Sequence, residues 1–224
     1  MSMLTNLDLI RRVPLFAKLT PDQATMLSHS VVKRRLKRGE LIVEQGKKSN
    51  SLYIILAGRA RVVMTDRKSR EVILATLNPG DYVGEMSLID NKPHSASVET
   101  EIQTDLLVLG RYEFTRCLEE NTATAQSVMA GLVQRLRKAD DKINSLALLD
   151  VYGRVAKVLM NFAEADGLKQ MVIRDKITRQ DIAKMVGASR EMVSRVMRDF
   201  EEQGLITTRE GGSILLKERR AVPR

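Results

Sequence analysis

The chain has 224 residues, 43% of them hydrophobic, with 37 basic and 28 acidic side chains and a formal net charge of +9. This composition excludes a disordered chain, and no apolar run approaches the length of a membrane span. The basic balance favours a polyanionic partner, and the absence of tryptophan and of an aromatic-anchored basic helix disfavours a membrane surface. The single cysteine, Cys117, excludes an internal disulfide and leaves too few thiols for an iron–sulfur cluster within one chain. Because the first residues also lack a secretory signal pattern, we expect a cytoplasmic protein.

The predicted secondary structure changes twice along the chain. Residues 5–30 have a helical pattern interrupted at Pro14 and Pro21. Residues 31–110 contain short β-rich runs separated by glycines, which predicts a sandwich or barrel. From residue 111 the pattern is helical again.

The segment NPGDYVGEMSLIDNKPHSASVET, residues 78–100, predicts an anion site within the β-rich part. Two glycine turns frame a short helix, GEMSLI, and the turn at Gly84 with the first N–H groups of that helix can form a nest for an anion. Glu85 cannot favour an anion, but its carboxylate can accept from a sugar hydroxyl. Ser95 can donate to a phosphate, as can His94 when protonated. The alternative is a glycine-rich barrel corner that binds nothing.

Residues 129–146 predict a coiled-coil seam. Apolar residues recur at alternating spacings of three and four, as in a heptad pattern; they are Met129, Leu132, Leu136, Ala139, Ile143 and Leu146. We expect a homodimer through this seam, and the alternative is that the helix packs against its own domain. A dimer matters because paired recognition helices read two half-sites about one helical turn apart.

Residues 178–206 predict two short amphipathic helices joined by a turn at Gly187. Thr178 and Asp181 can form a capping box on the first helix, and Ser189 can cap the second. The second helix has an apolar face, and its opposite face carries Arg190, Glu191, Ser194, Arg195 and Arg198. Guanidinium groups can bind guanine in a major groove, and a carboxylate can accept from cytosine.

Shorter elements flank this motif. We expect a helix at 151–165 and a short strand at 171–175 before it. After it, 205–208 and 214–216 are expected to form a hairpin around Gly211 and Gly212, which is a wing that can contact the phosphate backbone. The tail from residue 217 is expected to fray.

The motifs LNPGDYVGEMSLI, INSLALLDVYGRVAKVLMN and KITRQDIAKMVGASREMVSRVMRDFEEQGLI occur in an order that resembles the family of the cyclic-AMP receptor protein and the fumarate–nitrate regulator (CRP/FNR), which are bacterial transcription regulators. The resemblance implies an α+β fold with three parts: a cyclic-nucleotide-binding β-roll of jelly-roll type at 1–120, a long dimerisation helix at 121–149 and a winged helix-turn-helix domain at 150–224.

The resemblance also implies a nucleotide pocket that departs from that of cyclic-AMP binders. Gly84-Glu85 matches the family's Gly-Glu pair, in which the glutamate holds the ribose 2′-hydroxyl. His94-Ser95 stands where the family has Arg-Ser on the cyclic phosphate, and Ala139-Asp140 stands where it has Thr-Ser on the adenine. The expected ligand-binding residues are Gly84, Glu85, Met86, Ser87, His94, Ser95, Ala139 and Asp140.

These departures leave the effector open. It is cyclic AMP, cyclic GMP or cyclic di-GMP, or the pocket is empty and DNA binding is independent of an effector. No metal, haem or iron–sulfur cluster is expected, because the family's cysteine cluster is missing and His29 and Cys117 do not support haem ligation.

In the recognition helix the match to the cyclic-AMP receptor is complete. Arg190, Glu191 and Arg195 match its base-reading residues, which implies a palindrome with TGTGA-like half-sites. The expected DNA-binding residues are Thr178, Arg179, Gln180, Ser189, Arg190, Glu191, Ser194 and Arg195. RNA polymerase is a further expected partner. A nucleotide-binding regulatory subunit of an enzyme and a catalytic enzyme are the other classes considered; the 178–206 segment disfavours the first, and the lack of a catalytic constellation disfavours the second.

Overall fold

The computed structural model describes residues 5–166, 170–209 and 212–217. The chain divides into two compact units, Met1–Arg137 and Lys138–Arg224. The expected tail beyond residue 217 and Gly211 of the expected wing lie outside the described residues. None of the helices in the described part is long and apolar enough to cross a membrane.

The first unit begins with short helices, as the prolines predict. Helix α1 (Asn6–Arg12), the 3-10 turn η1 (Pro14–Phe16) and helix α2 (Pro21–Ser30) follow one another. Thr5 caps α1 and Thr20 caps α2, each in a capping box. Pro14 and Pro21 stand at the first positions of their elements, where proline's missing N–H costs nothing.

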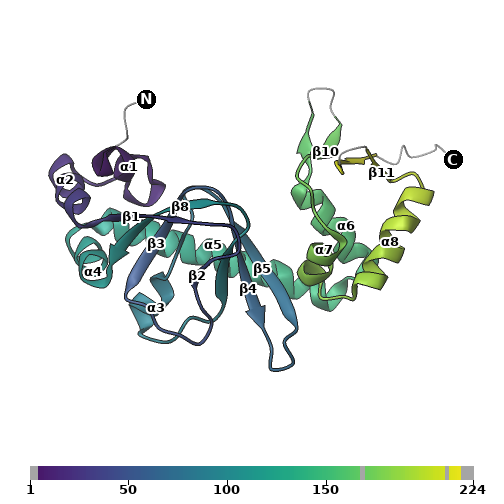
Figure 1. Cartoon of the computed structure of the whole chain (residues 1–224), viewed down its shortest axis with the longest axis horizontal. Helices are drawn as coiled ribbons and strands as arrows, with labels where there is room; N and C mark the ends of the chain where they lie inside the picture. The colour runs from purple at the N-terminus through teal and green to yellow at the C-terminus, as the bar shows by residue number, and fades with distance from the viewer. Residues whose placement is uncertain (1–4, 167–169, 210–211, 218–224) are drawn as a thin grey trace. The chain divides into compact units, whose positions relative to one another are not determined.

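Two four-stranded antiparallel sheets form the predicted β-roll (Figure 1). The first sheet has the order β1 (Val32–Leu36), β8 (Thr104–Gly110), β3 (Ser51–Ala57), β6 (Tyr82–Val83). The second has the order β2 (Leu41–Val43), β7 (Ser97–Thr100), β4 (Ala60–Thr65), β5 (Glu71–Leu77).

Strand β3, inside the first sheet, is buried on both faces, whereas the edge strand β1 is mostly exposed. Successive side chains of a strand point to opposite faces, so Ile54 and Ile55 of β3 belong to different cores. Ile55 packs with residues of the second sheet such as Val98. Ile54 packs in a cluster with Phe114 of α4 (Arg111–Glu120) and Val128 of α5 (Thr122–Leu148). The N-terminal part of α5 is thereby fixed to the β-roll.

Helix α5 is 27 residues long and includes the whole predicted seam. In the single chain its seam residues Met129, Leu136, Ile143 and Leu146 are exposed. Leu132 is half-buried against the β-roll core. At this position the helix therefore packs against its own domain, which was the alternative to a dimer seam.

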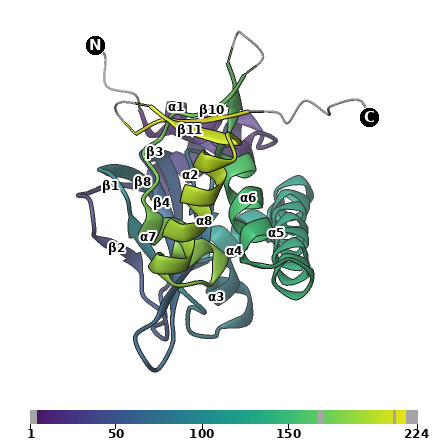
Figure 2. The same cartoon turned by 90° about the vertical axis from the view of Figure 1, so that its right-hand side faces the viewer.

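The second unit has the two-helix motif and a small sheet (Figure 2). Helix α6 (Val151–Phe162) precedes α7 (Arg179–Val186) and α8 (Arg190–Glu202). The sheet has the antiparallel order β11 (Ile206–Thr208), β12 (Ile214–Leu216), β10 (Met171–Ile173), β9 (Glu164–Ala165). Strands β11 and β12 form the predicted hairpin.

The predicted helix at 151–165 was too long. It ends at Phe162, because Ala163 is extended and Glu164–Ala165 pairs with β10 instead. The strand predicted at 171–175 is also shorter and ends at Ile173. The buried faces of α6, α7 and α8 meet in one core around Leu159, Ile182 and Val196.

Candidate functional site

The turn at Gly84 has the geometry predicted from the sequence. Its φ is +101°, in the left-handed region that favours glycine, and α3 (Glu85–Asp90) begins at the next residue. A Cβ on Gly84 would lie 2.4 Å from the backbone oxygen of Ser51 in β3. Both the conformation and the close approach therefore require glycine.

Glu85 is held in an unusual environment. The residue is 1% exposed, and its Oε1 accepts from Nη1 of Arg135 at 2.6 Å. Its other oxygen, Oε2, is buried and has no hydrogen-bond partner among the described residues. Burial raises the pKa of this carboxyl, and the Arg135 guanidinium opposes that shift.

Arg135 comes from α5 and also contacts Tyr82, in the strand before the Gly84 turn. Its guanidinium carbon lies 5.1 Å from the centre of the Tyr82 ring, within the range of a cation–π contact. Its Nη2 donates to the Tyr82 carbonyl oxygen. Neither residue is among the ligand-binding residues expected from the sequence, although Arg135 lies within the predicted seam segment 129–146.

The next two predicted ligand residues differ in exposure. The side chain of Ser87 is buried, and its hydroxyl donates to the carbonyl oxygen of Lys92 at 2.6 Å, which closes the loop after α3. Met86 is 51% exposed on the outer face of α3.

His94 and Ser95 lie in the loop before β7. The Nε2 atom of His94 is 2.9 Å from the hydroxyl of Ser49, and the ring is half-buried. Burial lowers the pKa of His94, so the neutral imidazole is favoured. Ser95 is exposed. Ala139 and Asp140 belong to the second unit and are exposed on α5.

The helix-turn-helix motif has the caps predicted for it. Thr178 and Asp181 form the capping box of α7, Gly187 ends that helix with a φ of +66°, and the Ser189 hydroxyl accepts from the Met192 N–H at the start of α8. The apolar face of α8 is buried through Val193 and its neighbours.

The predicted DNA-binding side chains lie on the other side of these helices. Arg179 and Ser194 are half-buried, and the rest are exposed: Thr178, Gln180, Ser189, Arg190, Glu191 and Arg195. The nearest approach of Arg179 to Glu201 is 3.9 Å. A hydrogen bond from its own backbone N–H lowers the pKa of Glu191, so the group is ionised at neutral pH and can act as an acceptor.

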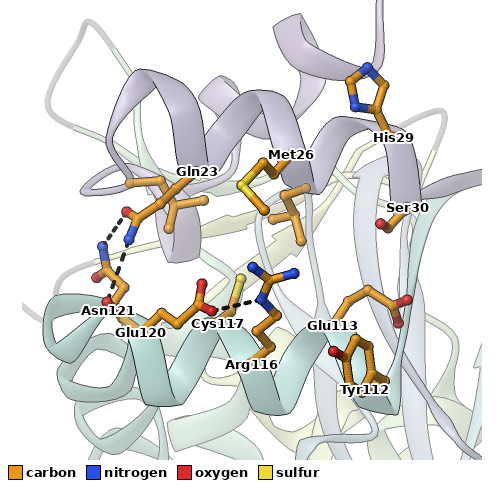
Figure 3. A pocket seen from close by; sticks show the side chains of 12 residues that line it. Gln23, Met26, His29, Ser30, Tyr112, Glu113, Arg116, Cys117, Glu120 and Asn121 are labelled. Carbon is orange, nitrogen blue, oxygen red and sulfur yellow. Dashed lines mark hydrogen bonds and ion pairs between the residues drawn. The ribbon is translucent and has the colours of Figure 1, made fainter.

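A separate hollow of about 280 Å³ lies between α2 and α4 (Figure 3). It is lined by residues that include His29 and Cys117, the two side chains considered above for haem. The His29 ring points away from α4 in this view, and Gln23 and Asn121 are hydrogen-bonded across one end of the hollow. No group of three or more His, Cys, Asp or Glu side chains able to hold a metal occurs in the described part of the chain.

Comparison with known proteins accounts for both units. Residues 33–121 match the family model of the cyclic nucleotide-binding domain, and residues 153–222 match that of the Crp-like helix-turn-helix domain. The chain is 33% identical over 195 residues to the cAMP-activated global transcriptional regulator CRP of Escherichia coli, covering 84% of this chain and 90% of that protein. The chain belongs to the CRP/FNR family.

Other relatives of this CRP/FNR protein agree. It is 32% identical over 185 residues to the cAMP-activated global transcriptional regulator Vfr of Pseudomonas aeruginosa, covering 78% of this chain and 84% of Vfr. The solved structure of the c-di-GMP responsive global regulator CLP of Xanthomonas campestris matches its fold with a TM-score of 0.77 at 22% identity, covering 89% of this chain and all of that one. The chain is therefore a cyclic-nucleotide-binding, DNA-binding transcription regulator of the CRP/FNR family.

Proposed function

We propose that this protein is a homodimeric regulator in which a cyclic nucleotide bound beside α3 controls the binding of paired α8 helices to a TGTGA-like palindrome. RNA polymerase is a further proposed partner. The proposal keeps the ligand-binding and DNA-binding residues expected above and adds Arg135 and Tyr82 to the nucleotide pocket.

The Glu85 carboxylate is the observation that carries this proposal. One of its oxygens is paired with Arg135, and the other is buried without a partner in the described part of the chain. A buried acceptor without a donor is costly, so such atoms mark sites where another group completes the bonding. A ribose hydroxyl is a suitable donor, and it can bond Oε2 without displacing Arg135. Because Oε2 is covered in this conformation, entry of the nucleotide requires a local shift of the α3 segment.

The pocket keeps one guanidinium, that of Arg135, while His94 replaces the family arginine. The family arginine expected on the cyclic phosphate is replaced here by a histidine whose pKa is lowered by burial. The Arg135 guanidinium on α5 remains charged at all relevant pH values, but it is paired with the Glu85 carboxylate.

Cyclic AMP is the first candidate effector, since the relatives CRP and Vfr are cAMP-activated regulators. Cyclic di-GMP is the second, because CLP is described as c-di-GMP responsive. The third possibility, an effector-independent DNA binder with an empty pocket, follows from the replacements at His94, Ala139 and Asp140.

Calorimetric titration of the full-length protein with cyclic AMP, cyclic GMP and cyclic di-GMP in turn tests the proposal. Binding of one of them, lost in the Glu85→Gln variant, supports a nucleotide pocket at α3. If none of the three nucleotides gives a heat of binding or changes the melting temperature, the protein is the effector-independent DNA binder.

A further inference from the structure

The backbone conformation at residue 131 of α5 does not require the glycine found there. Glycine in the interior of a helix is less favourable than alanine, and Gly131 has no positive φ that would require it. A Cβ at this position would lie 2.3 Å from the Tyr82 hydroxyl oxygen and 3.3 Å from the Tyr82 Cζ. The glycine therefore provides space for the Tyr82 side chain against the helix.

Arg135 contacts the same tyrosine from one helical turn further on. Residues four apart share a face of a helix, so Gly131 and Arg135 approach Tyr82 together. Arg135 stacks on the Tyr82 ring, donates to the Tyr82 carbonyl and pairs with Glu85. The contacts thus run without a break from α5 through Tyr82 to the first residue of α3.

The Tyr82 hydroxyl is buried and lacks a hydrogen-bond partner among the described residues. It also adds volume at the end of the ring that faces Gly131. That volume is what Gly131 accommodates.

We propose that Tyr82 is a positioning residue that holds the Arg135 guanidinium on the Glu85 carboxylate. The absence of a side chain at Gly131 leaves the room in which the Tyr82 ring lies against α5. The inference rests on the proposed function, because it takes Glu85 as the acceptor of a nucleotide hydroxyl. A side chain at residue 131 would push Tyr82 away from the helix, and the ring and carbonyl contacts of Arg135 would be lost with it.

The test is a set of full-length variants: Gly131→Ala, Tyr82→Phe and the double variant. We expect Gly131→Ala to weaken nucleotide binding by about tenfold and Tyr82→Phe alone to have little effect, since coupled neighbours show interaction energies of this order. The double variant should recover most of the affinity, because the phenylalanine lacks the oxygen that the new Cβ would meet. Affinities for cyclic AMP, cyclic GMP and cyclic di-GMP are measured by calorimetry alongside the melting temperature.

Gly110→Ala is the matched control, because its Cβ would meet the flexible end of Glu113 at 2.5 Å and no residue of the proposed nucleotide pocket. A merely structural role for Gly131 would lower the melting temperature and leave the nucleotide affinity unchanged, which would overturn the proposal. An affinity that stays low in the double variant would also overturn it, since the clash would then not involve Tyr82.

Failure of the proposed effector chemistry is a separate result. If the unaltered protein binds none of the three nucleotides, the inference is decided by DNA affinity, because α5 is one continuous helix from Gly131 into the second unit. Gly131→Ala must then change DNA affinity and the double variant must restore it. Equal DNA affinity in the unaltered protein and Gly131→Ala would overturn the proposal.

Discussion

A buried carboxylate with one unbonded oxygen is unfavourable unless another molecule uses that oxygen. Burial raises the pKa of Glu85, so the folded protein favours its protonated form. Stability linked to this group is therefore present below its unfolded pKa and is lost as the pH rises through its folded pKa. When Glu85 is ionised, its unbonded buried oxygen favours the arrival of a hydrogen-bond donor.

Glu85→Gln removes this charge and leaves the shape of the side chain. We expect nucleotide affinity to fall by about tenfold or more, because a hydrogen bond to a charged group is lost. The melting temperature should not fall, since Arg135 is 37% exposed and can be solvated. Asp90→Asn, at an exposed carboxylate on the same helix, is the control and should leave both values unchanged. A Glu85→Gln protein that binds nucleotide normally would remove Glu85 from the pocket.

His94 gives the pocket a pH dependence that an arginine would not. Its folded pKa is lowered by burial, so the stability associated with the neutral ring is lost as the pH falls below the unfolded pKa. A bound phosphate favours the imidazolium, and binding at neutral pH therefore takes up a proton. The Ser49 hydroxyl, 2.9 Å from Nε2, can act as donor or acceptor and tolerates either state.

We expect nucleotide affinity to rise as the pH is lowered from about pH 8 to about pH 6, across the range in which histidine titrates. His94→Arg should bind more tightly at the upper end and lose most of this dependence. His94→Gln is the matched control, since any pH effect that remains in it comes from Glu85 or other groups. The same pH profile in His94→Gln and the unaltered protein would exclude His94 from phosphate binding.

At the scale of elements, α8 separates a buried apolar face from an exposed basic one. Its hydrophobic side chains form the core of the second unit, so the exposed face can vary without loss of the fold. Arg190 is at the first turn of the helix, next to the ionised Glu191. N-terminal residues of a recognition helix are the ones that reach base edges.

Arg190→Ala should cost about 1–3 kcal/mol of DNA-binding free energy and relax one base position of a TGTGA palindrome. A mobility-shift assay on the palindrome and on single-base variants measures both effects. Arg198→Ala, which removes the same charge from the same helix outside the expected DNA residues, should keep the sequence preference. Unchanged binding by Arg190→Ala would contradict its role as a base reader.

Helix α5 presents an apolar seam that the single chain does not cover. Leu136 is 62% exposed, as is Ile143 one heptad later. Leu136→Glu should convert a dimer into a monomer, because it places charges in the centre of the seam. Sedimentation equilibrium measures this, with Lys138→Glu as an exposed control on the same helix. A Leu136→Glu protein that remains dimeric would place the interface elsewhere.

The features that the sequence predicted well are local ones. The caps at Thr178 and Ser189 and the turn at Gly84 depend on residues within a few positions, and the structure confirms them. The end of α6 was missed because the pairing of β9 with β10 competes with the helix. Arg135 was missed because its partner Glu85 is 50 residues away, and nothing in the heptad pattern indicates that contact.

At the scale of the whole molecule, Glu85, His94 and Arg135 belong to the first unit and the expected DNA-reading residues to the second. Helix α5 is part of both units. It carries Arg135, which contacts Glu85, in the first unit, and the expected ligand-binding residues Ala139 and Asp140 in the second. A ligand that binds two states of such a molecule unequally shifts the balance between them. By linkage, the effect of nucleotide on DNA affinity must equal that of DNA on nucleotide affinity.

The most direct test of this account is a titration of a fluorescent TGTGA palindrome with the full-length protein, with and without saturating nucleotide. We expect the nucleotide that binds in calorimetry to change the DNA affinity by about tenfold, a typical coupling between two sites. The Glu85→Gln variant should lose this change while retaining the nucleotide-free DNA affinity. Identical DNA affinity with and without that nucleotide would contradict the account and leave a DNA-binding protein that its pocket does not control.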